Sequence, residues 1–336
     1  MFLTNVVFTL VWYIYWRRKK QQREALLGGT IIPLFYPPTL PVGSAQRPLN
    51  PSEIHYALAL QQDPKQFAAE VVNMGVKGLL EIEYKPSIVW GSGTYTLTKK
   101  RDCNEQDLQL HHIVQQKLFF GRDSVQLTQT YQATLENVKS ALDGQMMLAL
   151  GGMFISEPFV ILTPAALGGA SLLIAMLMTG FSSAFAICAL VFYVFAGIWG
   201  NYITKTYTPE GCVLKNQILG FKLFLAATET DRMEVIGTPP TKTPELYEKY
   251  LPYAIALGVE KQWTKQFASV FAQLEKQGVH YQPLWYHGGS FETFNATALT
   301  SQISNSLQSA SQSSGGGGMG SSSSGGGRGG GGGGSW

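Results

Sequence analysis

The chain has 336 residues, of which 45% are hydrophobic and 14% charged, and its net charge at pH 7 is +3. Its 3 cysteines are an odd number without close spacing, so they give neither a disulfide framework nor a zinc signature. Residues 1–50 carry 6 basic and 1 acidic side chain, whereas residues 51–145 carry 9 basic and 11 acidic ones. Residues 204–300 carry 9 of each sign, so neither they nor residues 51–145 are basic, which argues against nucleic acid as the main partner.

An apolar stretch followed by positive charge opens the chain. Residues 2–16 are mostly apolar, and the basic cluster that follows consists of Arg17, Arg18, Lys19 and Lys20. A secretory signal would carry its positive charge before the apolar core. The order found here predicts a transmembrane anchor over residues 1–20. The positive-inside rule makes the basic cluster membrane-orienting and places it in the cytoplasm. The alternative is a buried core helix followed by a basic turn.

A proline-rich linker and two helix starts come next. The prolines between residues 21 and 50 make an extended, stiff connector. Asn50-Pro51-Ser52-Glu53 then combines a capping side chain, a proline at the first helical position and a carboxylate three residues after the cap. Asp63-Pro64 repeats the first two of these features. The sequence therefore predicts two helices in quick succession.

Alternating patterns predict a hairpin after these helices. Residues 80–85 and 94–98 alternate between apolar and polar side chains. Asn104 is expected to cap a third helix, and a short strand at residues 125–127 and a helix over residues 135–142 follow. This order of elements predicts a winged-helix-like cytosolic domain over residues 51–145. Its net negative charge makes DNA binding a poor expectation.

The run Met146–Ile203 is 58 residues long, and its only charge is Glu157. At about 1.5 Å per helical residue against a hydrocarbon core about 30 Å thick, it suffices for two membrane crossings. We expect a transmembrane hairpin with crossings at about residues 147–171 and 178–202. With the first anchor, this makes about three transmembrane helices.

The region after the run is mixed in composition and predicts a mostly helical cytosolic domain. Thr243-Pro244 is a helix start, and a later amphipathic helix has Trp263 and Phe267 on its apolar side. That side could pack on the cytosolic domain or lie on the lipid surface. From residue 301 the chain is rich in Ser and then in Gly, which predicts disorder up to Trp336.

These elements give an α+β membrane protein as the expected fold class. The predicted parts are the transmembrane anchor 1–20, the Pro-rich linker 21–50, the winged-helix-like domain 51–145, the transmembrane hairpin 146–203, the C-terminal cytosolic domain 204–300 and the disordered Gly/Ser-rich tail 301–336. The predicted location is the cell membrane, multi-pass, with both folded domains cytoplasmic.

Several motifs resemble a family of bacterial predicted membrane proteins, those built on domain of unknown function 2207. The motifs are Tyr36-Pro37-Pro38, Pro51-Ser52-Glu53, Gly220-Phe221-Lys222-Leu223-Phe224-Leu225, Glu229-Thr230-Asp231-Arg232, the stretch from Leu251 to Glu260, Trp263, Trp285-Tyr286 and the glycine tail closed by tryptophan. The resemblance implies a secreted signal and an extracytoplasmic domain before the anchor. This sequence begins at the anchor, and the alternatives are a fragment, a late start and a shortened member of the family. It implies no activity, substrate or catalytic residue.

Candidate chemistry is sparse. His111 and His112 are neighbours and would point about 100° apart on a helix, so they cannot share a metal; one is expected to face the core and the other the solvent. His280, His287 and Asp231 would matter only if they lined a pocket. We expect no catalytic, cofactor-binding or metal-binding residues, no cofactor and no enzymatic activity.

Two hypotheses for the function follow. The first is a non-catalytic membrane-anchored interaction or regulatory protein, whose partners are the lipid bilayer and an unknown protein, with a homo-oligomer as a further option. Trp336, at the end of a flexible tail, is its candidate partner-binding residue. The alternative is a transport or proton-linked role for Glu157, since a carboxylate at membrane depth is costly. Glu157 could instead lie near the lipid head groups.

Overall fold

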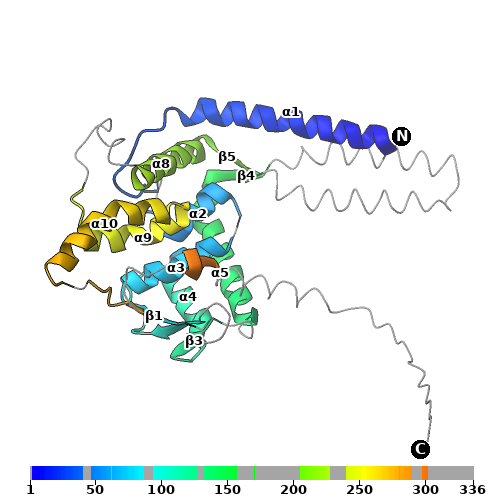
Figure 1. The fold of residues 1–336 in the computed structure, drawn as a ribbon. Helices are drawn as coiled ribbons and strands as arrows, with labels where there is room; N and C mark the ends of the chain where they lie inside the picture. The colour runs from blue at the N-terminus through cyan, green and yellow to red at the C-terminus, as the bar shows by residue number, and fades with distance from the viewer. Residues whose placement is uncertain are drawn as a thin grey trace, which may run out of the picture.

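A computed structural model of the chain is a body of helices with a small sheet at one end, from which one long helix extends (Figure 1). The described residues are 2–40, 47–61, 63–86, 94–127, 132–156, 170, 205–227, 240–279, 281–288 and 297–301.

Helix α1, Phe2–Gly28, is 27 residues long and contains the predicted anchor. Within the residues described, no helix has the length and apolar character that crossing a membrane requires. The expectation of about three transmembrane helices, and of a spanning anchor over residues 1–20, is therefore wrong. The physical reason in α1 is that its apolar part ends at Trp16, short of the roughly 20 residues that a span needs. The helix then continues through the basic cluster.

Helices α2, Pro51–Ala59, and α3, Pro64–Val76, begin where the sequence predicted. The Asn50 side chain accepts a hydrogen bond from Ser52 N, while the Glu53 carboxylate accepts one from Asn50 N at 2.8 Å. Asp63 caps α3 in the same way, through Lys65 N. Both capping predictions are confirmed.

The main sheet has the strand order β3-β2-β1-β6. Strands β1, Leu80–Lys85, and β2, Thr94–Lys99, form the predicted antiparallel hairpin, and β3, Ser124–Gln126, pairs with β2. The fourth strand, β6, Tyr286–His287, is parallel to β1 and comes from the far end of the chain. Since residues outside 51–145 complete this sheet, the winged-helix expectation is not supported.

Helices α4, Gln109–Phe119, and α5, Gln132–Leu150, pack against each other. The prediction that Asn104 caps α4 is wrong, because the helix begins at Gln109 without a side-chain cap. Asn104 instead accepts a hydrogen bond from Gln106 N, 3.1 Å away, in the preceding turn.

The start of the long apolar run also differs from the expectation. Its first residues complete α5, form a 3₁₀ turn at Gly151–Met153 and then form strand β4, Phe154–Ser156. Strand β4 pairs with β5, Lys205–Tyr207, on the other side of the run. Residues 147–156 are thus not the beginning of a membrane crossing. The remainder of the predicted hairpin, apart from residue 170, lies outside the described residues.

Helices α8, Pro209–Ala226, α9, Pro244–Leu257, and α10, Glu260–Lys276, complete the body, and α9 begins at the predicted Thr243 cap. Trp263 and Phe267 of α10 are fully buried, so its apolar side packs on the body. Helix α9 packs against α3, and residues from both 51–145 and 204–300 contribute to one hydrophobic core. That core fixes α2, α3 and α4 around the polar cluster described next.

Candidate functional site

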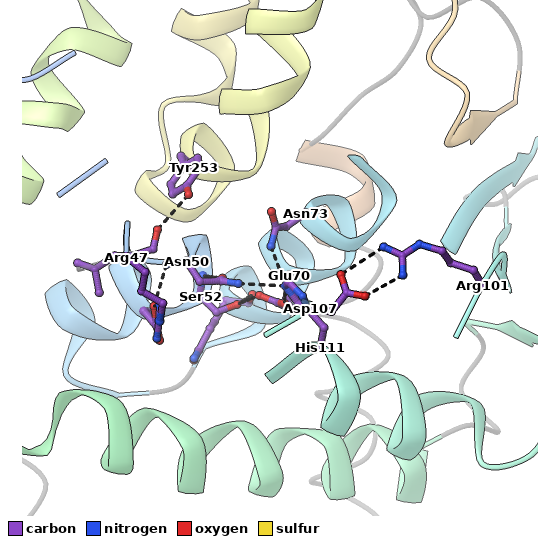
Figure 2. A network of polar contacts seen from close by, with 12 residues as sticks. Arg47, Asn50, Ser52, Glu70, Asn73, Arg101, Asp107, His111 and Tyr253 are labelled. Atoms are coloured by element: carbon purple, nitrogen blue, oxygen red, sulfur yellow. Dashed lines mark hydrogen bonds and ion pairs between the residues drawn. The ribbon is translucent and has the colours of Figure 1, made fainter. Parts of the chain in front are cut away.

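A buried polar cluster lies where the start of α2 meets α3 and α4 (Figure 2). Ser52 comes from α2, Glu70 from α3 and His111 from α4, and each is 0% exposed. The Ser52 hydroxyl donates to Glu70 Oε2 at 2.5 Å, and His111 Nε2 lies 3.2 Å from Glu70 Oε1. Three separate helices are therefore joined through one carboxylate.

The ring nitrogen His111 Nε2 has more polar neighbours than it can form hydrogen bonds with at one time. The amide nitrogens of Asn50 and Asn73 each lie 3.3 Å from it, besides the Glu70 carboxylate. The Asn50 amide cannot be turned over, because its oxygen accepts the hydrogen bond from Ser52 N. An amide nitrogen only donates and an ionised carboxylate only accepts. A hydrogen bond from the Asn50 amide would require an unprotonated Nε2, whereas one to Glu70 would require a hydrogen on Nε2.

The charge of Glu70 determines which of these two states of Nε2 is favoured. Burial raises the pKa of Glu70, but the hydrogen bonds from His111 and Ser52 and the nearby Lys77 charge outweigh it, so the pKa lies below its ordinary value. The ionised carboxylate favours a hydrogen on His111 Nε2, and the amide nitrogens are then non-bonded neighbours. The 3.2 Å contact falls short of good hydrogen-bond geometry, which leaves Glu70 Oε1 without a regular hydrogen bond in the described part of the chain. His111 Nδ1 is buried and has no hydrogen-bond partner among the described residues.

Two arginine–carboxylate pairs lie on either side of the cluster (Figure 2). Arg47 donates to both oxygens of Glu53 at 2.8 and 2.5 Å, which supports the cap of α2. Arg101 donates to Asp107 at 2.7 and 3.2 Å. The Arg101 hydrogen bonds, with one from Asn104 N, outweigh a small effect of burial and lower the pKa of Asp107 to about 2.

The lowered pKa of Asp107 predicts a pH dependence of stability. A carboxylate with a depressed pKa in the fold contributes stability above its unfolded pKa of about 4, and this is lost as the pH falls towards about 2. We expect Asp107→Asn to flatten the dependence of the unfolding free energy on pH in that window, measured by urea unfolding at a series of pH values. Asp123→Asn, at an exposed carboxylate 4.0 Å from Lys99, is the control and should follow the native chain.

The cluster is better suited to holding helices together than to catalysis. The Ser52 hydroxyl donates to Glu70 and not to a histidine base, and no member of the trio is exposed. A nucleophilic serine needs a base that takes its proton and a substrate that reaches it. Within the described ranges, no three His, Cys, Asp or Glu side chains could hold a metal ion together.

The structure does not bring the sequence-predicted site residues together. Arg17, Arg18, Lys19 and Lys20 lie on α1, where the first three are exposed. His287 lies on β6, with its Nε2 atom 3.5 Å from Glu81 Oε1, and that ion pair includes no member of the cluster. Glu157, Asp231, His280 and Trp336 lie outside the described residues, as does the Gly/Ser tail after residue 301.

Sequence reasoning identified only part of the buried cluster. His111 is buried and His112 exposed, as their spacing predicted. Glu70 and Asn73 were missed, and Ser52 was noticed only as part of a helix start. A signal was present: Glu70 lies on the apolar face of α3, one turn from Phe67 and from Met74. A carboxylate on a buried helical face requires a partner inside the fold.

Together these features define a mixed helix-and-strand protein with a sealed polar cluster and a projecting helix that exposes apolar and basic side chains. Residues 46–267 match the family model described as "Predicted membrane protein (DUF2207) C-terminal domain". The match covers more than half of the 336 residues, so the chain belongs to this family, as its motifs suggested. No curated protein and no solved structure matches it. Membership makes it a predicted membrane protein of a family without an assigned function.

Proposed function

We propose that the protein is a non-catalytic, membrane-associated interaction or regulatory protein, with its folded body on the cytoplasmic side of the cell membrane. Its partners would be lipid, through α1, and a protein not yet identified, for which Trp336 is the candidate contact. The observation that carries the proposal is the division of α1 into an exposed apolar part and a basic part attached to the body.

The first half of α1 offers apolar surface. Its exposed apolar side chains are Val7, Leu10, Val11 and Ile14. Aromatic and basic side chains follow: Lys19 lies 5.2 Å from the ring centre of Tyr15, and Lys20 lies 5.3 Å from that of Trp16. Aromatic and basic residues gather in this way at the level of lipid head groups, with the basic side towards the cytoplasm.

The second half of α1 is attached to α8. Lys215 Nζ lies 2.8 Å from Glu24 Oε2, and the Asn216 side chain donates to Gly29 O at 2.8 Å. In Figure 1, α1 runs beside α8 and then continues past the body. Lipid contact by the first half would therefore hold the whole body close to the membrane.

The sealed cluster supports a non-catalytic role. Ser52, Glu70 and His111 have the chemistry of a hydrolytic site but are closed off from solvent. A substrate would have to separate α2, α3 and α4 to reach them. We therefore assign the cluster to the stability of the fold and expect partner binding outside it.

The orientation of the body gives the test. In intact cells that express the full chain, added protease should leave the body intact, and lysis should make it susceptible. The triple variant Arg17→Gln/Arg18→Gln/Lys19→Gln should release several-fold more of the body from the membranes of lysed cells, because basic segments are attracted to anionic lipid head groups. The triple variant Lys261→Gln/Lys265→Gln/Lys276→Gln removes the same charge from exposed positions of α10 and should change nothing. Digestion of the native body in intact cells would overturn the proposal.

A further inference from the structure

Strands β4 and β5 hold the two ends of the long apolar run at one point of the body. Ser156, the last residue of β4, pairs directly with Lys205, the first residue of β5. Between them lie residues 157–204, whose only charge is Glu157. Phe154 and Tyr207 of the pair pack edge to face with ring centres 5.6 Å apart. Whatever environment that run enters, its two ends are therefore fixed together at the edge of the body.

Large apolar side chains are exposed next to this point. Met147 and Leu148 in the last turn of α5 are 60% and 81% exposed, and Ile155 on β4 is 41% exposed. The turn Gly151–Met153 joins them within a few residues of chain. Single exposed apolar residues are ordinary, but a cluster marks an interaction surface.

A basic side chain of α1 meets Lys205 of β5 at the same edge. Lys20 of α1 donates a hydrogen bond to Lys205 O. Lys205 Nζ in turn donates to Leu60 O at 3.1 Å and lies 5.5 Å from the ring centre of Tyr56. These contacts place the end of the basic cluster beside the β4–β5 pair, as Figure 1 shows for α1 and β5.

We propose that Met147, Leu148 and Ile155, with the neighbouring Lys20 and Lys205, form a junction surface with which the body itself lies on the membrane. The inference rests on the proposed function and adds a second contact, borne by the folded body, to the one made by α1. Met147, Leu148 and Ile155 would enter the head-group region, while the Lys20 and Lys205 contacts hold α1 and α2 against the same edge of the body.

Lipid is favoured over a protein as the occupant for two reasons. The apolar run of residues 157–204 starts and ends at the edge of this surface, so any lipid that solvates the run also meets the surface. The exposed apolar half of α1 also extends past the same edge (Figure 1). One flat environment can contact both the junction surface and this half of α1, whereas a docked protein would have to fit beside the helix.

The test uses an environment-sensitive fluorophore on single cysteines. Leu148→Cys reports on the junction surface, Val11→Cys on α1, and Phe120→Cys is the matched control in a chain whose native cysteines are replaced. Phe120 is also 81% exposed, and it ends α4 beside β3, at the opposite end of the body from β4 and β5 (Figure 1). Each full-length protein is reconstituted into phosphatidylcholine–phosphatidylglycerol vesicles that contain spin-labelled lipid, and lipid quenching is measured.

We expect quenching at position 148 to equal that at position 11 and to exceed that at position 120 several-fold. Strong quenching at 11 with no more at 148 than at 120 would overturn the junction surface and leave the proposed function standing. Equal quenching at all three positions would also overturn the junction surface, because the contact would not be specific. Absence of quenching at all three would overturn both. Circular dichroism of the three proteins establishes that the replacements leave the fold unchanged.

Discussion

Replacing His111 by leucine is expected to lower the free energy of unfolding by about 3–5 kcal/mol, the usual cost of removing the partner of a buried ionised carboxylate. Glu70 would keep its full burial but lose the ring nitrogen 3.2 Å from Oε1. Only the Ser52 hydroxyl, bonded to the other oxygen, would remain to support the carboxylate. Urea unfolding of the detergent-solubilised chain, followed by tryptophan fluorescence, measures the loss.

The fold supplies a matched control for this prediction. His287 and Glu81 form a second His–Glu pair with a similar separation of 3.5 Å, but their side chains are 50% and 24% exposed. His287→Leu should therefore change the unfolding free energy by less than about 1 kcal/mol. The double variant Glu70→Leu/His111→Leu should lose less stability than His111→Leu alone, since no charge is left unpaired. Equal losses in the two single variants would show that burial of the His111 pair has no energetic role.

Local structure in this chain was largely readable from its sequence. The caps at Asn50, Asp63 and Thr243 are short-range devices in which a side chain bonds a backbone N–H two or three residues ahead. Such contacts depend on few residues, so their pattern in the sequence is close to their pattern in space. The hairpin of β1 and β2 follows from alternation in the same way.

Long-range pairing was not readable. Strand β6 has only two residues, Tyr286 and His287, and its place beside β1 depends on segments some two hundred residues apart. Strand β4 was hidden because Phe154-Ile155-Ser156 belongs to an apolar run, in which a buried strand and the start of a crossing look alike. The buried cluster was missed for a related reason: its members are single polar residues from separate helices, and only the packed fold brings them together.

Helix α2 connects the buried cluster to the junction surface. Its first turn carries the Asn50 cap and Ser52, which bonds Glu70. Its last turn receives the Tyr207 hydroxyl, which donates to Ala57 O at 2.8 Å. Loosening the cluster should therefore disturb the β4–β5 pair before it disturbs α10, which packs on α9 and α8. If the junction surface lies on the membrane as proposed, a loosened cluster should also weaken that contact through this short helix.

Gly220→Ala is expected to detach the segment that ties α1 to the body. A Cβ at Gly220 would lie 2.0 Å from Ile32 O, a backbone atom that cannot give way alone. The segment would have to move off α8, breaking the hydrogen bond from Leu34 N to Gly220 O and the edge contact between Phe35 and Phe224. We expect a loss of about 1–3 kcal/mol in unfolding free energy and faster proteolysis near Ile32.

Gly144→Ala is the control for Gly220→Ala, because it places the same methyl group on another helix. Nothing lies within 4 Å of a Cβ at Gly144 on α5. With no clash, the intrinsic preference of helices for alanine should dominate, and Gly144→Ala should stabilise the chain by about 0.5–1 kcal/mol. Opposite signs for the two glycines would locate the effect in the contact with Ile32. A gain in stability at both positions would mean that the segment after α1 does not press on α8, and that α1 is held by the Lys20, Glu24 and Gly29 contacts.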